Sequence, residues 1–233
     1  LAFPMDASCG SGRGDEMTQM TSDEGAAIQP VALEGRFVRL EPLELTHVPA
    51  LVLAASEERE TYGWTFVPDG IPAMREYVET AIGLRGKRQA APFATIDRAT
   101  GRVLGTTRFA NFEHIAWPLA NPGQRGAEYP DGVEIGWTWL AASAQRTSIN
   151  TEAKYLMLGH AFETWRVHVV RLKTDRRNER SRAAIERVGA RLDGVIRAHQ
   201  AASDGELRDT AFYSLIEAEW PGAKAALEAR LAR

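Results

Sequence analysis

Seven short stretches of the chain alternate apolar and polar residues, or carry apolar runs between turn residues, as β-strands do. They cover residues 37–40, 92–97, 103–109, 133–140, 168–174, 192–197 and 209–215. In the clearest, alternation predicts one face with Val133, Ile135, Trp137 and Trp139, and an opposite face with Glu134, Gly136, Thr138 and Leu140. Polar turns at 97–102 and 204–205 join two pairs of strands into hairpins.

Five other segments have the periodicity or the end signals of helices. They cover residues 45–58, 71–84, 151–165, 179–188 and 223–231. Thr46 is a candidate N-cap of the first, and Pro72 suits the first turn of the second. The segment 151–165 is apolar on most sides, so we expect it to lie largely buried. Strands followed by helices, with hairpins at both ends, indicate one α/β domain with a mixed sheet.

Residues 1–29 differ from the rest because they are small and polar. This segment carries Asp6, Asp15, Glu16, Asp23 and Glu24 against a single arginine. Such a composition buries too little apolar surface to offset the entropy of ordering, so we expect a disordered tail and then one domain over residues 30–233. Within that domain, residues 116–129 form a long loop rich in proline and glycine, and loops of this length are often functional.

Composition narrows the function classes without choosing one. The 233 residues include 28 Lys and Arg against 31 Asp and Glu, and a net charge of −3 favours neither nucleic acid nor an anionic membrane. One cysteine excludes a disulfide framework, and His160 and His168 lack metal-ligand spacing, so no metal site is expected. No apolar run approaches the roughly 20 residues that span a bilayer, so we expect a soluble, cytoplasmic protein.

The polar turn 141–150 joins the strand 133–140 to the helix expected from Thr151. A helix N-terminus has unpaired N–H groups and the positive end of the helix dipole, and both suit a bound phosphate. The hydroxyl groups of the turn and Arg146 add hydrogen-bond donors. A simple capped loop, with Asn150 or Ser148 as the N-cap, fits at least as well. The turn alone leaves both interpretations open.

Residues 133–197 as a whole resemble the acyl-CoA site of the GNAT superfamily of N-acetyltransferases, and especially its RimJ/RimL-like branch. Residues 145–150 stand where the family has Gln/Arg-x-x-Gly-x-Gly/Ala, residues 151–153 read Thr-Glu-Ala, residues 161–163 read Ala-Phe-Glu, and residues 178–181 match Asn-x-x-Ser. A weaker match covers nearly all of the folded part. The resemblance implies a mixed, mostly antiparallel sheet that is splayed at its centre and flanked by helices.

The resemblance also implies direct transfer of an acyl group to a primary amine, with acetyl-CoA or succinyl-CoA as the co-substrate. By their place in the motifs, the residues expected to bind CoA are Trp139, Leu140, Ala141, Gln145, Arg146, Thr147, Ser148, Ile149, Asn150, Thr151, Asn178, Ser181 and Ile185. A backbone N–H near Leu140 would stabilise the oxyanion, and Asn178 would hydrogen-bond the pantetheine arm. Basic residues such as Arg39 or Arg108 would admit the carboxylate of a succinyl group.

Two residues are expected to carry the proton transfers. Glu134 matches the strand glutamate that deprotonates the amine in related enzymes, and Glu113 and Glu128 are lesser candidates. Ser181 matches the serine proposed to protonate the departing thiolate. Structural interpretations stay open for the same positions: Glu134 as a strand residue paired with an arginine, Asn178 as a helix N-cap, and Ser181 as an ordinary first-turn residue.

Three positions depart from the family pattern. Ser148 and Asn150 stand where glycine would let the backbone approach the phosphates, and Ile185 stands where many members have a catalytic tyrosine. These departures leave an alternative function, a non-catalytic acyl-CoA-binding or interaction module. The expected acceptor is a protein N-terminus, a lysine or a small amine, with no nucleic-acid or membrane partner. Because relatives are often dimers, a homo-oligomer is also considered.

Overall fold

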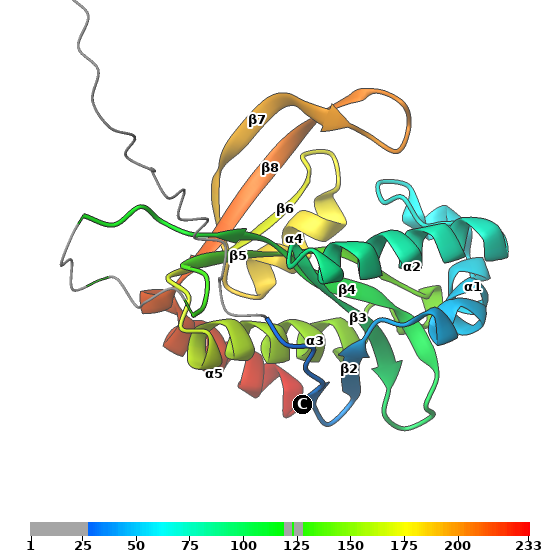
Figure 1. The fold of residues 1–233 in the computed structure, drawn as a ribbon, viewed down its shortest axis with the longest axis horizontal. Helices are drawn as coiled ribbons and strands as arrows, with labels where there is room; N and C mark the ends of the chain where they lie inside the picture. The colour runs from blue at the N-terminus through cyan, green and yellow to red at the C-terminus, as the bar shows by residue number, and fades with distance from the viewer. Residues whose placement is uncertain (1–27, 119–122, 124–127) are drawn as a thin grey trace, which may run out of the picture.

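The computed structural model describes residues 28–118, 123 and 128–233 (Figure 1). Most of the expected tail (1–29) and the middle of the loop 116–129 lie outside these ranges. Of the helices in the described ranges, none has both the length and the apolar character needed to cross a bilayer.

Within the described residues, eight strands form one sheet in the order β1-β2-β3-β4-β5-β6-β8-β7. The strands are β1 (Leu33–Glu34), β2 (Val38–Pro42), β3 (Ala90–Asp97), β4 (Val103–Glu113), β5 (Gly132–Leu140), β6 (Val169–Asp175), β7 (Arg191–Ala201) and β8 (Leu207–Ile216). Neighbouring strands are antiparallel except for β5 and β6. The seven predicted strands are all present, and β3–β4 and β7–β8 are the predicted hairpins.

The sheet is splayed between the parallel strands β5 and β6. Their pairing covers residues 132–134 of β5 and 169–171 of β6, although β5 continues to Leu140 and β6 to Asp175. Beyond Glu134, the edge of β5 that faces β6 therefore has no strand partner among the described residues. This arrangement confirms the expected mixed, mostly antiparallel sheet that opens at its centre.

Helices cover both faces of the sheet (Figure 1). They are α1 (Val48–Ser56), α2 (Gly70–Gly86), α3 (Ser148–Gly159), α4 (Glu179–Arg187) and α5 (Trp220–Leu231), and α3 continues as a π-helical turn at His160–Thr164. α1 and α2 pack on one face around Leu51 and Met74. α3, α4 and α5 pack on the other face, where Met157, Ile185 and Leu227 share one core.

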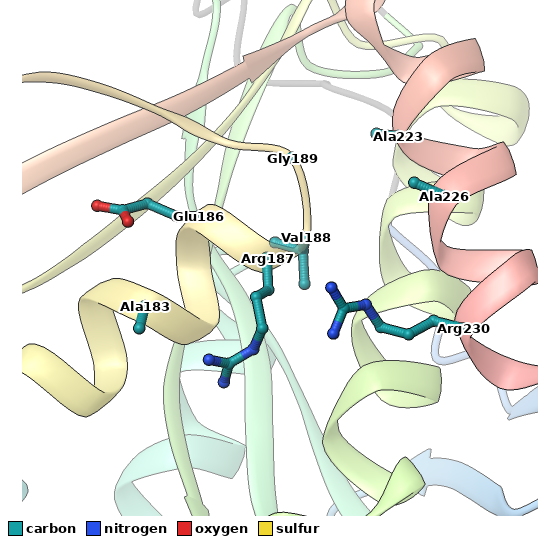
Figure 2. Close-up of a pocket in the computed structure, with 8 residues that line it drawn as sticks. All are labelled: Ala183, Glu186, Arg187, Val188, Gly189, Ala223, Ala226 and Arg230. Carbon is teal, nitrogen blue, oxygen red and sulfur yellow. The ribbon is translucent and has the colours of Figure 1, made fainter. Parts of the chain in front are cut away.

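A glycine ends α4 where this helix meets α5. Gly189 has a φ of 98°, and a Cβ there would lie 2.8 Å from the Cβ of Ala223. A side chain at this position would therefore be strained by its backbone and crowded by α5. Figure 2 shows the hollow between the two helices, with Arg187 on one side and Arg230 on the other. No residue predicted to act in binding or catalysis is among the described residues that line this hollow.

The first predicted helix begins later than expected. Residues Leu45–His47 form a 3-10 turn, and α1 begins at Val48. Thr46 lies inside that turn and is not a cap. The extended residue before the turn is Glu44, whose N–H donates to Nδ1 of His47 at 3.0 Å. The N-cap requires an extended backbone, and Glu44 has it.

α3 begins at Ser148, earlier than the predicted start at Thr151. Thr147 has the extended backbone of an N-cap, with φ −106° and ψ −178°, and its Oγ1 accepts a hydrogen bond from the N–H of Ile149 at 3.3 Å. Ser148 and Asn150, the two predicted caps, both lie in the first helical turn. Because Thr147, Ser148 and Asn150 are all suitable N-caps, the sequence alone did not show where the helix starts.

The side-chain alternation along β5 reverses at Trp137, so the predicted faces are wrong beyond this residue. Trp137 has a φ of 50°, and the register with β4 shifts there. Such a bulge inserts one residue and moves every later side chain to the opposite face. Leu140 consequently joins Ile135 in the core beside α3, whereas Trp139 enters the core beside α1 and α2.

The start of α3 is tied to the sheet by Glu152, which is buried. Its carboxylate accepts the backbone N–H groups of Arg36, Phe37 and Val38 at 2.8, 2.6 and 2.7 Å. Gly35 permits this approach, because a Cβ there would overlap the carboxylate. Charge-assisted bonds of this kind offset the cost of burying a carboxylate. The Thr-Glu-Ala segment thus holds the helix start in place.

Candidate functional site

The turn between β5 and α3 presents main-chain N–H groups at the start of a helix. It contains the 3-10 turn η3 (Ala142–Ala144) and then Arg146, whose φ is 60°. In the described part of the chain, the N–H groups of Arg146 and Thr147 donate to no acceptor. Ser148 is the first helical residue, so its N–H has no partner within the helix. These donors lie at the positive end of the dipole of α3 and are suited to an anion.

Gln145, a predicted CoA ligand, faces into the protein. Its Nε2 donates to the carbonyl of Leu140 and to Oγ1 of Thr61, both at 3.0 Å. Its Oε1 accepts from Arg180 of α4 at 2.6 Å. Gln145 therefore braces the turn between the 3-10 turn η2 (Arg59–Tyr62) and α4. The side chain of Arg146, by contrast, is exposed.

The two departures from glycine in the turn do not strain the backbone. Neither Ser148 nor Asn150 has a positive φ, so neither position requires glycine for its conformation. Ser148 and Thr151 are half-buried, and Ile149 is buried in the core beside α3. Oδ1 of Asn150 is buried without a hydrogen-bond partner among the described residues. The departures change side-chain volume and polarity and leave the exposed N–H groups in place.

The predicted ligands at the end of β5 are mostly buried side chains. The Trp139 ring packs edge-on against Tyr62, with ring centroids 6.1 Å apart, and Leu140 lies in the core beside α3. The N–H of Ala141 already donates to the carbonyl of Leu104 at 2.7 Å. Of this group, only backbone atoms on the free edge of β5 face the gap towards β6.

Glu134 lies in β5 at the point where β5 and β6 part. It is 6% exposed, and its Oε2 accepts from Lys173 of β6 at 3.0 Å and from Asn111 of β4 at 2.8 Å. Its ion-pair partner is thus a lysine and not the arginine considered from the sequence. In the described structure no donor reaches Oε1, and this atom is not one of the fully buried, unpartnered atoms. Oε2 of Glu134 is therefore fixed by two donors, whereas Oε1 is available to accept a proton.

The lesser candidates for the base are less well placed. Glu113 binds Arg171 through both carboxylate oxygens, at 2.6 and 3.0 Å. Glu128 is exposed and follows the loop segment that lies outside the described residues. Glu134 is therefore the carboxylate that the fold brings to the gap.

Asn178 and Ser181 belong to the start of α4. Oδ1 of Asn178 accepts the N–H of Ser181 at 3.0 Å, so the N-cap interpretation of Asn178 is correct, and its Nδ2 remains a potential donor. Ile185, one turn after Ser181 on the same helix face, is buried in the core beside α3. Ser181 therefore lies on the face of α4 that turns towards the core beside α3, whereas Glu134 lies on the α2 side of the sheet.

Comparison with known proteins identifies the family. Residues 38–191 match the family described as Acetyltransferase (GNAT) domain, which is more than half of the chain. The chain belongs to the GNAT acetyltransferase family. Over 188 residues it is 27% identical to YdaF of Bacillus subtilis (strain 168), named as a candidate ribosomal N-acetyltransferase, covering 79% of this chain and 92% of YdaF. This similarity supports the predicted RimJ/RimL-like branch.

Two crystal structures show the same family. A GCN5-related N-acetyltransferase from Brucella melitensis is 28% identical with a TM-score of 0.73, covering 87% of this chain and 86% of that chain. A candidate acetyltransferase from T. thermophilus is 35% identical with a TM-score of 0.69, covering 87% and 98%. The family and the fold identify this protein as an N-acyltransferase, as the sequence predicted.

Sequence reasoning did not single out Lys154, a buried lysine of α3. Its Nζ donates to Oγ1 of Thr138 at 2.7 Å and to Oγ1 of Thr107 at 3.1 Å, and it forms no ion pair within the described residues. Burial lowers the pKa of Lys154 to about 7. The available signal was a lysine in a helix that is apolar on most sides. Lys154 lies beneath the bulge of β5, on the side of the sheet opposite Glu134.

Replacing Lys154 with methionine is expected to raise the free energy of unfolding at pH 7 by about 2 kcal/mol, because a buried amine is exchanged for an apolar chain of similar length. Thr107 and Thr138 remain bonded to each other at 2.8 Å. The pKa of Lys154 is about 7 when folded and 10.5 in a model compound, so wild-type stability should rise with pH between these values.

Denaturant unfolding at several pH values from about 6 to 9.5 measures this effect. The Lys154→Met variant should lack the rise of stability with pH, and Lys87→Met, at the exposed C-cap of α2, should retain it. Parallel pH dependences of wild type and Lys154→Met would contradict the expectation.

Proposed function

We propose that this enzyme transfers an acetyl group from acetyl-CoA to a primary amine by direct attack of the amine on the thioester. The observation that carries the proposal is the set of unpaired N–H groups at residues 146–148, in the turn that follows the unpaired end of β5. The gap between β5 and β6 is bordered by the partly free carboxylate of Glu134.

Three features would hold the donor. The diphosphate of CoA would accept the N–H groups of Arg146, Thr147 and Ser148 at the start of α3. The pantetheine arm would run along the free edge of β5 and take its backbone hydrogen bonds as an added strand does. A hollow lined by Ser56, by residues 58–61 and by Arg180 adjoins the turn near Gln145 and would offer space for the nucleotide.

The chemistry follows from the groups around the gap. Oε1 of Glu134 would accept a proton from the ammonium, while Lys173 and Asn111 hold Oε2. The free amine then forms a C–N bond at the thioester carbonyl, and a backbone N–H of β5 near Leu140 stabilises the oxyanion. Collapse of this intermediate breaks the C–S bond, the nitrogen loses its surplus proton to solvent to give the neutral amide, and Glu134 returns its own proton to solvent. The hydroxyl of Ser181 would protonate the departing thiolate and recover a proton from solvent.

The proposed acceptor is a protein N-terminus, and the proposed acyl group is acetyl. The name of YdaF refers to ribosomal acetylation, which supports a protein N-terminus as the acceptor here. Succinyl-CoA is the alternative donor, with Arg108 as the group that would meet its carboxylate. Arg39 does not serve this purpose, because it lies on β2 and pairs with Glu41 at 3.1 Å. A homo-oligomer remains a prediction.

Acetyl-CoA and free CoA are expected to raise the melting temperature of the purified protein, because they bind only the folded state. Release of CoA thiol should then require an amine, tested with peptides bearing free N-termini, an N-acetylated lysine peptide and small amines. Stabilisation without thiol release from any amine would establish the non-catalytic acyl-CoA-binding module instead. Absence of both effects would overturn the proposal.

A further inference from the structure

Arg108 of β4 is a buried arginine with no anionic partner in the described part of the protein. Its side chain and backbone together are only 4% exposed. The guanidinium carbon lies 5.3 Å from the ring centroid of Tyr77 on α2 and 5.0 Å from that of Trp137 on β5. No hydrogen bond or ion pair of its five N–H donors occurs among the described residues. Buried charges are normally paired, so this guanidinium can accept a partner that none of the described residues supplies.

The guanidinium reaches open space beside the proposed base. Its nitrogens are absent from the fully buried, unpartnered atoms of the described residues, so they are not sealed in. Arg108 pairs in register with Gly136, on the same face of the sheet as Glu134. Gly136 has no side chain to cover this area, and a Cβ there would lie 3.0 Å from Oε1 of Glu134. Arg108 and Glu134 therefore lie close together on one face of the β4–β5 pair, beside the proposed reaction site.

This face of the sheet has an excess of positive charge. Lys173 lies 5.8 Å from the ring centroid of Trp137, on the opposite side of the gap from β4. Arg208 of β8 is half-buried; burial lowers its pKa, and the charges of Asp175 and Glu134 act in the opposite direction. Asp175 is already bound by Arg177 at 2.8 Å, as Glu134 is by Lys173. The local carboxylates are thus engaged while Arg108 has none among the described residues.

We propose that Arg108 binds a carboxylate carried by one of the two reacting molecules, and so selects an acidic substrate. The proposal rests on the proposed function, because it places the carboxylate next to the transferred acyl group. A guanidinium presents its N–H donors as a planar fork, and a carboxylate accepts such a fork through both oxygens. The carboxylate comes either from the amine acceptor or from the far end of a succinyl chain.

The experiment compares pairs of substrates that differ by one carboxylate. The donor arm measures kcat/KM for succinyl-CoA against butyryl-CoA, whose acyl chains have the same number of carbons. The acceptor arm uses acetyl-CoA with peptides that carry aspartate or asparagine at their second and third positions, and with an amino acid or its amide. In one of the two arms, kcat/KM should be roughly 10- to 100-fold higher for the substrate that carries the carboxylate.

Arg108→Met should remove this preference, and Arg39→Met, an ion-paired arginine on β2, should retain it. If Arg108→Met does not fold, Arg108→Lys, which keeps the charge without the fork, should reduce the preference. Equal rates within both arms in the wild type, or a preference that survives in the folded Arg108→Met variant, would overturn the proposal. If no substrate is turned over, the proposed function fails separately. Calorimetry of the same pairs then tests Arg108 by binding alone.

Discussion

Changing Glu134 to glutamine is expected to lower kcat by about 10²- to 10⁴-fold, the usual contribution of a general base. Glutamine keeps the size of the side chain and can still meet Asn111 and Lys173, but it cannot take a proton from the ammonium. The affinity for acetyl-CoA should stay within a few-fold of wild type, because the N–H groups proposed to bind the diphosphate are on the turn before α3. Steady-state kinetics together with calorimetric titration of CoA separates the two effects.

Glu113→Gln is the matched control for this experiment. Glu113 is also a strand glutamate near the gap, but both of its oxygens bind Arg171. Its replacement should cost some stability and leave kcat close to wild type. A large fall of kcat in Glu113→Gln with little change in Glu134→Gln would move the base to Glu113 and contradict the assignment. The same result would also remove the argument that places the acceptor beside Arg108.

Changing Ser148 to aspartate is expected to weaken CoA binding by about 100-fold or more, because the new carboxylate occupies the anion position at the start of α3 and repels the diphosphate. The same carboxylate interacts favourably with the positive end of the helix dipole, so the free energy of unfolding should stay level or rise by about 0.3–1 kcal/mol. Binding and stability thus move in opposite directions. Calorimetric titration and denaturant unfolding of the same preparation measure both quantities.

Thr100→Asp is the control for the added negative charge, because it places one carboxylate at the exposed turn between β3 and β4. That variant should bind CoA as the wild type does. If Ser148→Asp bound CoA normally, the diphosphate would lie elsewhere, and the turn at residues 146–148 would be a capped loop without a binding role.

Much of the site could be predicted from the sequence because it depends on neighbours along the chain. A polar turn between a strand and a helix produces unpaired N–H groups wherever it lies in the fold. The family motifs then predicted that these N–H groups bind the diphosphate of CoA, and they indicated Glu134, on the strand before the turn, as the base. The start of the helix was harder, because Thr147, Ser148 and Asn150 are all suitable caps and the backbone chooses among them.

The partners of the buried charges could not be predicted in the same way. Whether Glu134 meets a lysine or an arginine depends on the register between β5 and β6, which is set by contacts between segments far apart in sequence. In the sequence Lys154 reads as an ordinary helix residue, and Arg108 is one of two basic residues considered for a succinyl carboxylate. Their isolation from any carboxylate of the described residues becomes visible only when every neighbouring element is in place.

Local patterns therefore sufficed for the strands, for the existence of the helices, for the polar turn before α3 and for the family, because periodicity and turn chemistry act over a few residues. These local patterns could not predict the bulge at Trp137. One inserted residue moves Trp139 and Leu140 each to the face opposite to the one that the alternation predicted. No local propensity reveals this shift, because it arises from how β5 pairs with β4. The same pairing places Arg108 opposite Gly136, so the substrate selection proposed for Arg108 depends on the assembled sheet.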